Sequence, residues 1–311
     1  MFTEDTIHSF MKKILLTALV VLLSSVLLSC NSHFKYTKML HPFDDSFNLY
    51  ETLKVDKFDL QSTLLQKSQQ FNHILDTFIS SSDLDFHFEG STQLKQRITE
   101  SILIIDQLLA KYDIQEQISI SFNGGKDCMV MLILFISRLS VQIPQQHPFW
   151  TNQKLNSALV NYEQQFPEVT TFIDEACHDY NLQLLQINDT MKSGFQQYLD
   201  QNTNVKTIVI GTRDTDPYSQ HLKPFQMTDN DWPRFQRVHP ILQWSYHDIW
   251  GFLKAFQIPY CSLYDLGYTS IGGVDTTIPN PELQIEGNKY LPAYLLKDGA
   301  KERDGRLRKN K

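Results

Sequence analysis

Cysteine is scarce in this 311-residue sequence, and it is not placed for metal binding or for a disulfide framework. Cys128, Cys177 and Cys261 lie far apart, with no CxxC pair and no Cys/His spacing of the metal-ligand type. Zinc sites and small disulfide-stapled scaffolds need such spacings, so neither class is expected. The thiols are expected to stay reduced, and Cys128, inside an apolar run, is expected to be a packing residue.

An excess of basic charge is also missing. The chain has 28 Lys and Arg against 35 Asp and Glu, a net charge of -7. A general nucleic-acid binder needs a basic surface, so no nucleic-acid partner is expected. The stretch from Lys297 to Lys311 is a local exception. It contains seven basic and three acidic residues, which gives it a net charge of 7 - 3 = +4. This stretch is either a solvated chain end or a cationic patch for an anionic small molecule.

The hydrophobic pattern predicts an α/β fold. Apolar runs of strand length alternate with helical stretches, which is typical of an open, mostly parallel, Rossmann-like sheet with helices on both faces. The expected strands are residues 118–122, 158–162, 182–187 and 206–212.

Four helices are predicted around this sheet. Apolar residues recur at helical spacing from Leu60 to Phe78 and from Leu94 to Leu109, and the run from Cys128 to Leu139 is long enough for a buried helix. Ser245 and Asp248 form a capping-box pattern for a helix through Ala255. Residues 141–156 are expected to be a connecting loop. From Cys261 onward there is little periodicity, so a loop-rich C-terminal part is expected.

The strongest local signal lies between the first strand and the buried helix. Its residues are Ser121, Phe122, Asn123, Gly124, Gly125, Lys126 and Asp127. Adjacent glycines permit a close backbone approach, and the helix that follows presents unpaired N–H groups and a positive dipole end. The stretch lacks the GxxxxGK[ST] pattern of P-loop proteins. It predicts a polyphosphate cradle of another type.

Two further constellations are expected at the same edge of the sheet, because ligands bind beyond the carboxyl ends of parallel strands. The first is GTRDTDPY at 211–218, where Arg213 could pair with a phosphate and Asp216 could orient a metal ion or a ligand. The second is LKPFQMTDNDWPRF at 222–235, whose Trp232 could stack on a flat heterocycle. The alternative for the first motif is an ordinary surface turn, and the alternative for the second is a set of aromatic core residues.

The motifs together resemble a known family. NGGKD at 123–127 is similar to the SGGKD loop of the PP-loop ATP pyrophosphatases and the PAPS reductase-like family, which cleave ATP between its α and β phosphates. Taken in order with GTRDTDPY, LKPFQMTDNDWPRF and LYDLGYTSIGG, it resembles the eukaryotic FAD synthases of the fungal type over about two thirds of the chain. The resemblance implies an adenine nucleotide alpha hydrolase-like fold over residues 58–311. It also implies a nucleotidyltransferase that converts FMN and ATP to FAD and pyrophosphate, with Mg²⁺ as cofactor and no assigned metal ligands.

The resemblance also assigns the site. The catalytic residues it implies are Asn123, Asp127, Asp216, Arg303 and Arg306. For ATP it implies residues 121–127 (Ser121, Phe122, Asn123, Gly124, Gly125, Lys126 and Asp127) with Asn161, Gly211 and Arg213. For FMN it implies Thr212, Asp216, Asp229, Trp232, Pro233 and Arg237. The sequence departs from the fungal pattern at Thr212 and Asp214 and is shorter between Gly273 and Tyr290.

Other functions remain open at this point. A sulfonucleotide reductase shares the GYTSIG stretch at 267–272 but needs a late nucleophilic cysteine, and the last cysteine here is Cys261. A PP-loop ligase that adenylates a carboxylate or amide does not explain the aromatic segment from Asp229 to Trp244. A membrane-tethered nucleotide-binding protein without turnover is the alternative from a different class.

That last alternative comes from the N-terminus. Residues 14–29 carry no charge, follow Lys12 and Lys13, and end in Leu-Leu-Ser-Cys. As a helix they would span ~24 Å, short of the ~30 Å hydrocarbon core, which favours a signal-like segment or a short anchor within an N-terminal extension at 1–45. An ATP-using enzyme is expected in the cytoplasm. The segment could therefore tether the domain, address it to an organelle, or be an appended stretch, and membrane contact is expected only through it.

Overall fold

The computed structural model describes residues 48–82 and 90–307. The chain divides into two units, Met1–Leu40 and His41–Lys311, and the description below concerns the second. The expected N-terminal extension at 1–45, with its hydrophobic segment 14–29, lies outside the described residues. Within the described ranges, no helix has both the length and the apolar character needed to cross a membrane.

A six-stranded sheet forms the centre of this unit, in the order β3-β2-β1-β4-β6-β5. All neighbouring pairs are parallel except β5 with β6, which confirms the predicted mostly parallel α/β fold. The strands are β1 (Ile118–Ser121), β2 (Leu155–Val160), β3 (Leu182–Ile187), β4 (Thr207–Ile210), β5 (Phe225–Met227) and β6 (Gln236–Val238). The expected strand at 158–162 begins three residues earlier, because Leu155 pairs in register with Leu182. The antiparallel edge strand was not predicted.

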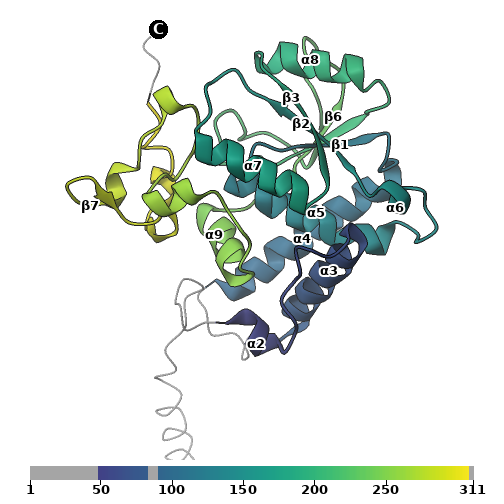
Figure 1. Ribbon diagram of the computed structural model, residues 1–311, viewed down its shortest axis with the longest axis horizontal. Coiled ribbons are helices and arrows are strands. Elements are labelled where there is room, and N and C mark those ends of the chain that lie inside the picture. Colours follow the sequence, from purple (N-terminus) through teal and green to yellow (C-terminus); the bar gives the residue numbers. More distant parts are fainter. Residues whose placement is uncertain (1–47, 83–89, 308–311) are drawn as a thin grey trace, which may run out of the picture. The chain divides into compact units, whose positions relative to one another are not determined.

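Helices cover both faces of the sheet, as Figure 1 shows. One face carries α3 (Leu64–Ser80), α4 (Ser91–Lys111), α5 (Lys126–Gln142), α7 (Pro167–Asp179) and α9 (Tyr246–Ala255). The opposite face carries α8 (Met191–Gln201). Strand β4 shows why both faces are filled: Ile208 is buried in the α8 cluster and the next residue, Val209, in the larger cluster.

Several local predictions are confirmed. The apolar run at 128–139 lies within α5, where it is almost entirely buried. Helix α9 begins with the predicted capping box, in which the Ser245 hydroxyl accepts from the Asp248 N–H and the Asp248 carboxylate accepts from the Ser245 N–H. The expected loop at 141–156 is interrupted by the short helix α6 (Phe149–Asn152), whose Phe149 and Trp150 are buried. A further short helix, α2 (Leu49–Leu53), buries Leu49 in the main core, upstream of the domain start expected at 58.

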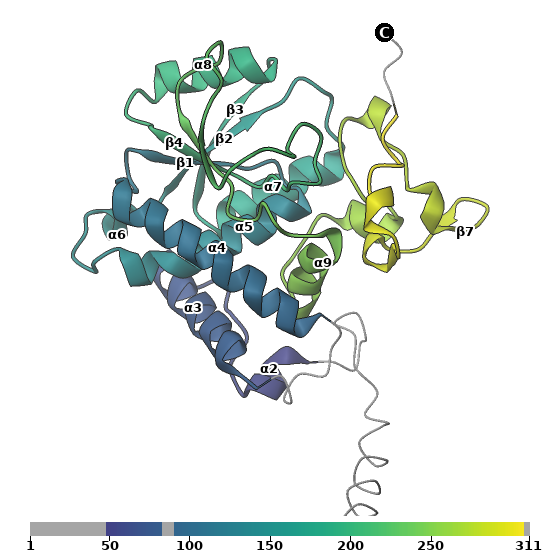
Figure 2. The same cartoon turned by 180° about the vertical axis from the view of Figure 1, so that it is seen from behind.

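The part after Cys261 is built from short turns and one small hairpin, as expected from its lack of periodicity (Figure 2). The hairpin joins β7 (Gln284–Glu286) to β8 (Lys289–Tyr290), and the turns are the 3-10 segments Ser262–Leu266, Val274–Thr276, Pro281–Leu283, Ala293–Leu295 and Gly299–Lys301. Asn280 ties these pieces together from a fully buried position. Its side-chain amide donates to the Thr269 hydroxyl and to the Lys301 carbonyl, both at 2.8 Å.

Candidate active site

The glycine loop is held in one conformation between β1 and α5. Gly124 has φ = +72° and is packed so closely that a Cβ there would be 2.8 Å from Ile173, so both the backbone angle and the space require glycine. The Asn123 side chain accepts from the Gly125 N–H at 3.0 Å, and the Lys126 N–H donates to the Tyr264 hydroxyl at 3.0 Å. The loop therefore delivers a fixed set of backbone groups to the start of α5.

The second motif begins against the same helix end. A Cβ on Gly211, just after β4, would be 3.1 Å from the backbone nitrogen of Cys128 and 3.2 Å from the carbonyl carbon of Asp127. Only glycine lets β4 end this close to the first turn of α5. Because β1 and β4 are parallel neighbours, the two motifs lie at the same carboxyl edge of the sheet, as predicted.

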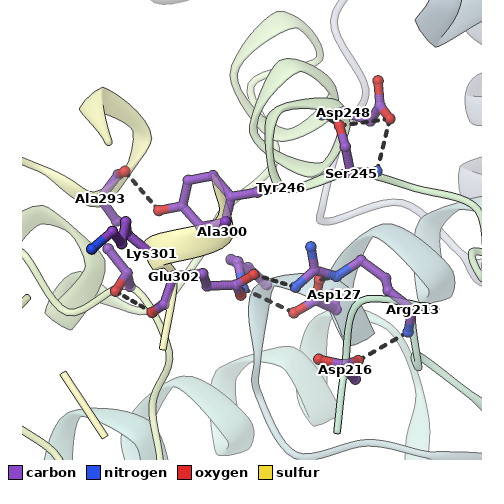
Figure 3. A network of polar contacts seen from close by, with 12 residues as sticks. Asp127, Arg213, Asp216, Ser245, Tyr246, Asp248, Ala293, Ala300, Lys301 and Glu302 are labelled. Carbon is purple, nitrogen blue, oxygen red and sulfur yellow. Dashed lines mark hydrogen bonds and ion pairs between the residues drawn. The ribbon is translucent and has the colours of Figure 1, made fainter. Parts of the chain in front are cut away.

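Four charged side chains pair in a ring at the start of α5, and Figure 3 shows Asp127, Arg213 and Glu302 of this ring. Lys126 Nζ pairs with Asp127 Oδ2 at 3.0 Å and with the carboxylate of Glu302. Arg213 Nε approaches Asp127 Oδ1 at 2.7 Å, and Arg213 Nη2 donates to Glu302 Oε2 at 2.6 Å. Lys126 and Arg213 are only 2% and 1% exposed. Two cations and two carboxylates thus pair with one another, although Arg213 Nη1 has no hydrogen-bond partner among the described residues.

The charge state of this ring follows from burial and pairing. Burial raises the pKa of Asp127, but Lys126 and Arg213 outweigh it, and the net shift is downward. Burial lowers the pKa of Lys126, but Asp127 and Glu302 outweigh it, and the net shift is upward. The pKa of Arg213 is raised by the same two carboxylates against its burial. Lys126, Asp127 and Arg213 therefore stay charged near neutral pH.

Asp216 behaves differently from Asp127. Its Oδ2 accepts the backbone N–H of Arg213 at 2.9 Å, which closes the turn after β4. Burial raises its pKa above the ordinary value of 3.8, although that N–H bond and the Arg213 charge act in the opposite direction. Asp216 is the acidic side chain of this motif that lines a cavity.

That cavity has a volume of about 620 Å³ and holds most of the predicted FMN residues. Thr212, Asp216, Asp229, Trp232 and Arg237 line it, whereas Pro233 does not. Pro233 is buried instead, and its carbonyl accepts the Thr228 hydroxyl at 2.7 Å. The remaining lining residues include Met191, Phe195, Ile210, Leu222 and Phe235, which give the cavity an apolar wall beside its polar groups.

Among the lining residues that the sequence did not assign to the site are His239 and Tyr218. The His239 imidazole is buried, and burial together with Arg237 lowers its pKa to about 4, so it lines the cavity as a neutral ring. Tyr218 is fully exposed and has φ = +66°, a strained backbone angle for a bulky side chain. In the sequence, Tyr218 looks like an ordinary turn residue and His239 like an ordinary core residue, and no pattern near either one indicates a site.

A smaller cavity of about 130 Å³ lies at the glycine loop. Its lining includes Asn123, Gly124, Gly125 and Asn161, four of the predicted ATP residues. The other predicted ATP side chains do not reach it: Phe122 is fully buried in the core, and Lys126 and Arg213 lie in the charge ring. Glu163, another residue missed in the sequence, also lines this cavity and accepts the Gly273 N–H at 2.9 Å.

The C-terminal arginines lie on a turn that folds back onto this cavity. The Arg306 N–H bonds to the Arg303 carbonyl at 2.9 Å, so the two residues share a turn rather than a helix. Arg306 is half-buried, forms an isolated bridge with Thr277, and places its guanidinium against Gly272 of the small cavity. Arg303 is exposed. Burial and the charge of Arg303 lower the pKa of Arg306. Up to Leu307, then, the basic C-terminal stretch is folded rather than solvated filler.

The sheet is mostly parallel, the glycine loop lies where its strand order reverses, and a cavity with acidic and aromatic residues lies at the same edge. This arrangement defines a nucleotide-binding α/β enzyme of the PP-loop class.

The phosphoadenosine phosphosulfate reductase domain family matches residues 117–198 and 190–279. The probable FAD synthase of Schizosaccharomyces pombe is 40% identical over 216 residues, 68% of this chain and 80% of that protein. The flavin adenine dinucleotide synthase of Saccharomyces cerevisiae is 34% identical over 214 residues, 64% of this chain and 70% of that protein.

The solved structures agree with these relatives. Candida glabrata FMN adenylyltransferase, crystallised with FMN and the ATP analogue AMPCPP, is similar with a TM-score of 0.71 and 28% identity, over 79% of this chain and all of that one. The yeast FAD synthetase in complex with FAD gives a TM-score of 0.72 at 27% identity. The chain belongs to the FAD synthase family, within the phosphoadenosine phosphosulfate reductase domain family.

Proposed function

We propose that this chain transfers the adenylyl group of ATP to FMN and produces FAD and pyrophosphate. The observation that carries the proposal is the placement of the glycine loop and of the 620 Å³ cavity at one edge of the sheet. Gly211 joins them, because it packs on the first turn of α5 while Thr212, the next residue, lines the large cavity. Membership of the FAD synthase family supports the same reaction.

ATP is assigned to the glycine loop and its small cavity. The glycines of the loop leave room for the β and γ phosphates, and the N-terminus of the 17-residue helix α5 offers them a positive dipole end. Asn161, on the same cavity, contributes a side chain after β2. The triphosphate would then lie between the loop and Arg306.

FMN is assigned to the large cavity. Trp232 offers a flat surface for the isoalloxazine ring, and Asp229 and Arg237 offer polar groups for its edge. Asp229 is exposed and lies 3.9 Å from Arg237, so both groups are within reach of a ligand that enters from solvent. Thr212 and Asp216 lie at the end of the cavity formed by the turn after β4, which is where the FMN phosphate must meet ATP.

The reaction needs alignment and charge neutralisation rather than a general base. An oxygen of the FMN phosphate, already anionic near neutral pH, forms a bond to the α-phosphorus of ATP. The bond from that phosphorus to the bridging oxygen breaks, and pyrophosphate leaves with the electron pair into the glycine loop. Arg303 and Arg306 neutralise the developing charge. Because Lys126 and Arg213 are buried in the charge ring, their proposed role is to hold Asp127 and the start of α5 in place.

Mg²⁺ is proposed as cofactor on the chemistry of the available donors. The described residues contain no group of three or more His, Cys, Asp or Glu side chains placed to hold a metal ion. Mg²⁺ with nucleotides commonly uses only one or two carboxylates and takes its other oxygens from phosphates and water. Asp216 fits that mode, since it lines the cavity and only its Oδ2 is bonded to Arg213. The ion would supply charge neutralisation for the phosphates.

The burial of the cysteines weighs against the reductase alternative. Burial raises the pKa of Cys128 to about 12 and also raises that of Cys261, so neither thiol is prepared to act as a nucleophile. We place the adenylyl transfer in the cytoplasm because it consumes ATP. A membrane role would require the segment at 14–29, outside the described residues.

The test is a product assay. The purified protein is mixed with ATP, Mg²⁺ and FMN, and FAD and pyrophosphate are measured by chromatography. Equal amounts of the two products are expected, and riboflavin in place of FMN is expected to give none because it lacks the attacking phosphate. A folded, ATP-binding protein that forms no FAD would contradict the proposal and favour the non-catalytic alternative.

A further inference from the structure

Glu302 is a buried carboxylate that the sequence did not single out. It comes from the C-terminal turn, 176 residues away from Lys126 and 89 from Arg213, yet each of its oxygens contacts one of these two cations. The residue is 8% exposed. Figure 3 shows it reaching across to the Arg213 guanidinium from the segment that holds Lys301. Glu302 therefore closes the ring that fixes Asp127.

The backbone of this turn is fixed independently of the ring. The Thr269 hydroxyl donates to the Glu302 carbonyl at 2.6 Å, and the Asn280 amide donates to the Lys301 carbonyl at 2.8 Å. Asn280 and Thr269 are themselves hydrogen-bonded and buried. Glu302 is thus presented by a rigid platform, and Arg303, the next residue along the chain, starts from the same platform.

Glu302 is needed for the charge balance of the ring. Without it, two buried cations would share the single carboxylate of Asp127, and an unpaired buried charge is strongly unfavourable. Lys126 or Arg213 would then have to move toward solvent or toward the nucleotide phosphates. Either movement would withdraw a partner from Asp127 and disturb the first turn of α5, where the glycine loop ends.

We propose that Glu302 is a positioning residue that couples the docked C-terminal turn to the phosphate loop, so that the loop and the two arginines are assembled together. Its side chain closes the ring around Asp127, and the chain directly after it brings the Arg306 guanidinium against Gly272, which lines the small cavity. The inference rests on the proposed adenylyl transfer for its kinetic readout. Its structural readout does not depend on that reaction.

The decisive variant is Glu302→Gln, which keeps the shape and one of the two hydrogen-bond acceptors, replaces the other with an NH2 donor, and removes the charge. We expect kcat for FAD formation to fall by about tenfold or more while KM for FMN stays within about twofold, because the defect lies at the phosphates. Asp304→Asn is the matched control. It removes one carboxylate charge from the same turn, but Asp304 is exposed and pairs only loosely with Lys301, at 3.5 Å. Its kcat is expected to be unchanged.

A second measurement separates failure of this inference from failure of the proposed function. Amide hydrogen exchange of residues 123–127 is followed with and without AMPCPP in wild type, Glu302→Gln and Asp304→Asn. Faster exchange in the loop of Glu302→Gln alone supports the coupling, even for a chain that forms no FAD. Unchanged loop exchange, or a kcat per folded molecule equal to that of wild type, would overturn it.

If Glu302→Gln does not fold, the charge balance can be restored by Glu302→Gln combined with Arg213→Gln. The ring would then hold one cation and one carboxylate. Recovery of a cooperative melting transition in the double variant is expected, because the excess buried positive charge is gone. A double variant that also shows no melting transition would indicate that Glu302 acts through packing alone and would contradict the proposal.

Discussion

The guanidinium of Arg306 lies against the backbone of Gly272, so closely that a Cβ on Gly272 would overlap it. Gly272 lines the small cavity at the glycine loop, 34 residues before Arg306 in the chain. The absence of a side chain at one position therefore makes room for a cation from the C-terminal turn. This contact allows the role of Arg306 to be tested without changing Arg306 itself.

Gly272→Ala is expected to displace Arg306 while the fold is retained, because the end of a flexible side chain can move. We expect kcat to fall by about tenfold or more, by analogy with the loss of a charge contact in the transition state. The control is Gly251→Ala in α9, where a Cβ would make only an ordinary contact with Leu94 at 3.9 Å. That variant should keep full activity and gain slightly in melting temperature, since alanine favours a helix. Full activity in Gly272→Ala would remove Arg306 from the mechanism.

The arginine pair itself gives a second prediction. The double change Arg303→Ala with Arg306→Ala is expected to lower kcat by ~100-fold with little loss of thermal stability, because neither side chain belongs to the core. Lysine at both positions should recover only part of the rate, since an ammonium retains the charge but loses the planar two-donor fork. Steady-state kinetics and melting curves on the same samples check both statements. Near-normal FAD synthesis by the alanine variant would contradict them.

Asp127→Ala is expected to abolish turnover and also to destabilise the fold. From the sequence motif alone, Asp127 is a polar loop residue, and its removal would leave the fold intact. The structure instead places Asp127 between two buried cations. Removing it leaves an excess buried positive charge, which destabilises by about 3 to 5 kcal/mol in comparable pairs. Because its folded pKa is lowered, its stabilisation is present above the unfolded pKa and is lost as the pH falls. Urea unfolding at several pH values measures this, and a pH-independent difference from wild type would contradict it.

Asp216 should respond in the opposite sense. Its pKa is raised, chiefly by burial, so the ionised form is disfavoured in the folded state and lowers stability at neutral pH. Asp216→Asn is therefore expected to melt at the same or a higher temperature at pH 7, yet to lose activity, because the group that faces the phosphates is gone. In wild type, the acid limb of kcat/KM should lie above 3.8. A clear fall in melting temperature would show that Asp216 serves the fold instead.

The FMN assignment predicts a separation of the two Michaelis constants. Trp232→Ala and Asp229→Ala are expected to raise KM for FMN and leave that for ATP nearly unchanged, since stacking and edge recognition precede the chemistry. Asp231→Ala is the control, because Asp231 is exposed, does not line the large cavity, and pairs with Lys192 at 3.2 Å. A rise in KM for ATP alone would place the flavin elsewhere.

The sequence predicts the sheet and the edge at which the site lies, because both depend on local signals. The glycine loop, the strand alternation and the capping box at Ser245 each lie within a few neighbouring residues, and each leaves a readable pattern. Some lining residues of the large cavity were also predicted, since Trp232 and Asp229 belong to a motif with a distinctive residue sequence. The displaced start of β2 and the edge strand β5 were not, because pairing register depends on residues far away in the chain.

The burial of Lys126 and Arg213 could not be predicted from the sequence. In a phosphate-binding motif, a basic side chain is expected to face the ligand, and nothing near either residue indicates otherwise. Their partner Glu302 stands in a basic stretch whose net charge suggests repulsion rather than a buried pair. Only the fold of the C-terminal turn, fixed by Thr269 and Asn280, brings this carboxylate to them.

In the proposed reaction, the α-phosphorus of ATP is transferred to FMN while the β and γ phosphates leave together. Incubation with ATP labelled at the α phosphate, and in a parallel sample at the γ phosphate, tests it most directly. The α label is expected to appear in FAD and the γ label in pyrophosphate, with equal yields in the presence of FMN and Mg²⁺. A γ label in inorganic phosphate or in a flavin product, with the α label retained in a free adenine nucleotide, would contradict adenylyl transfer.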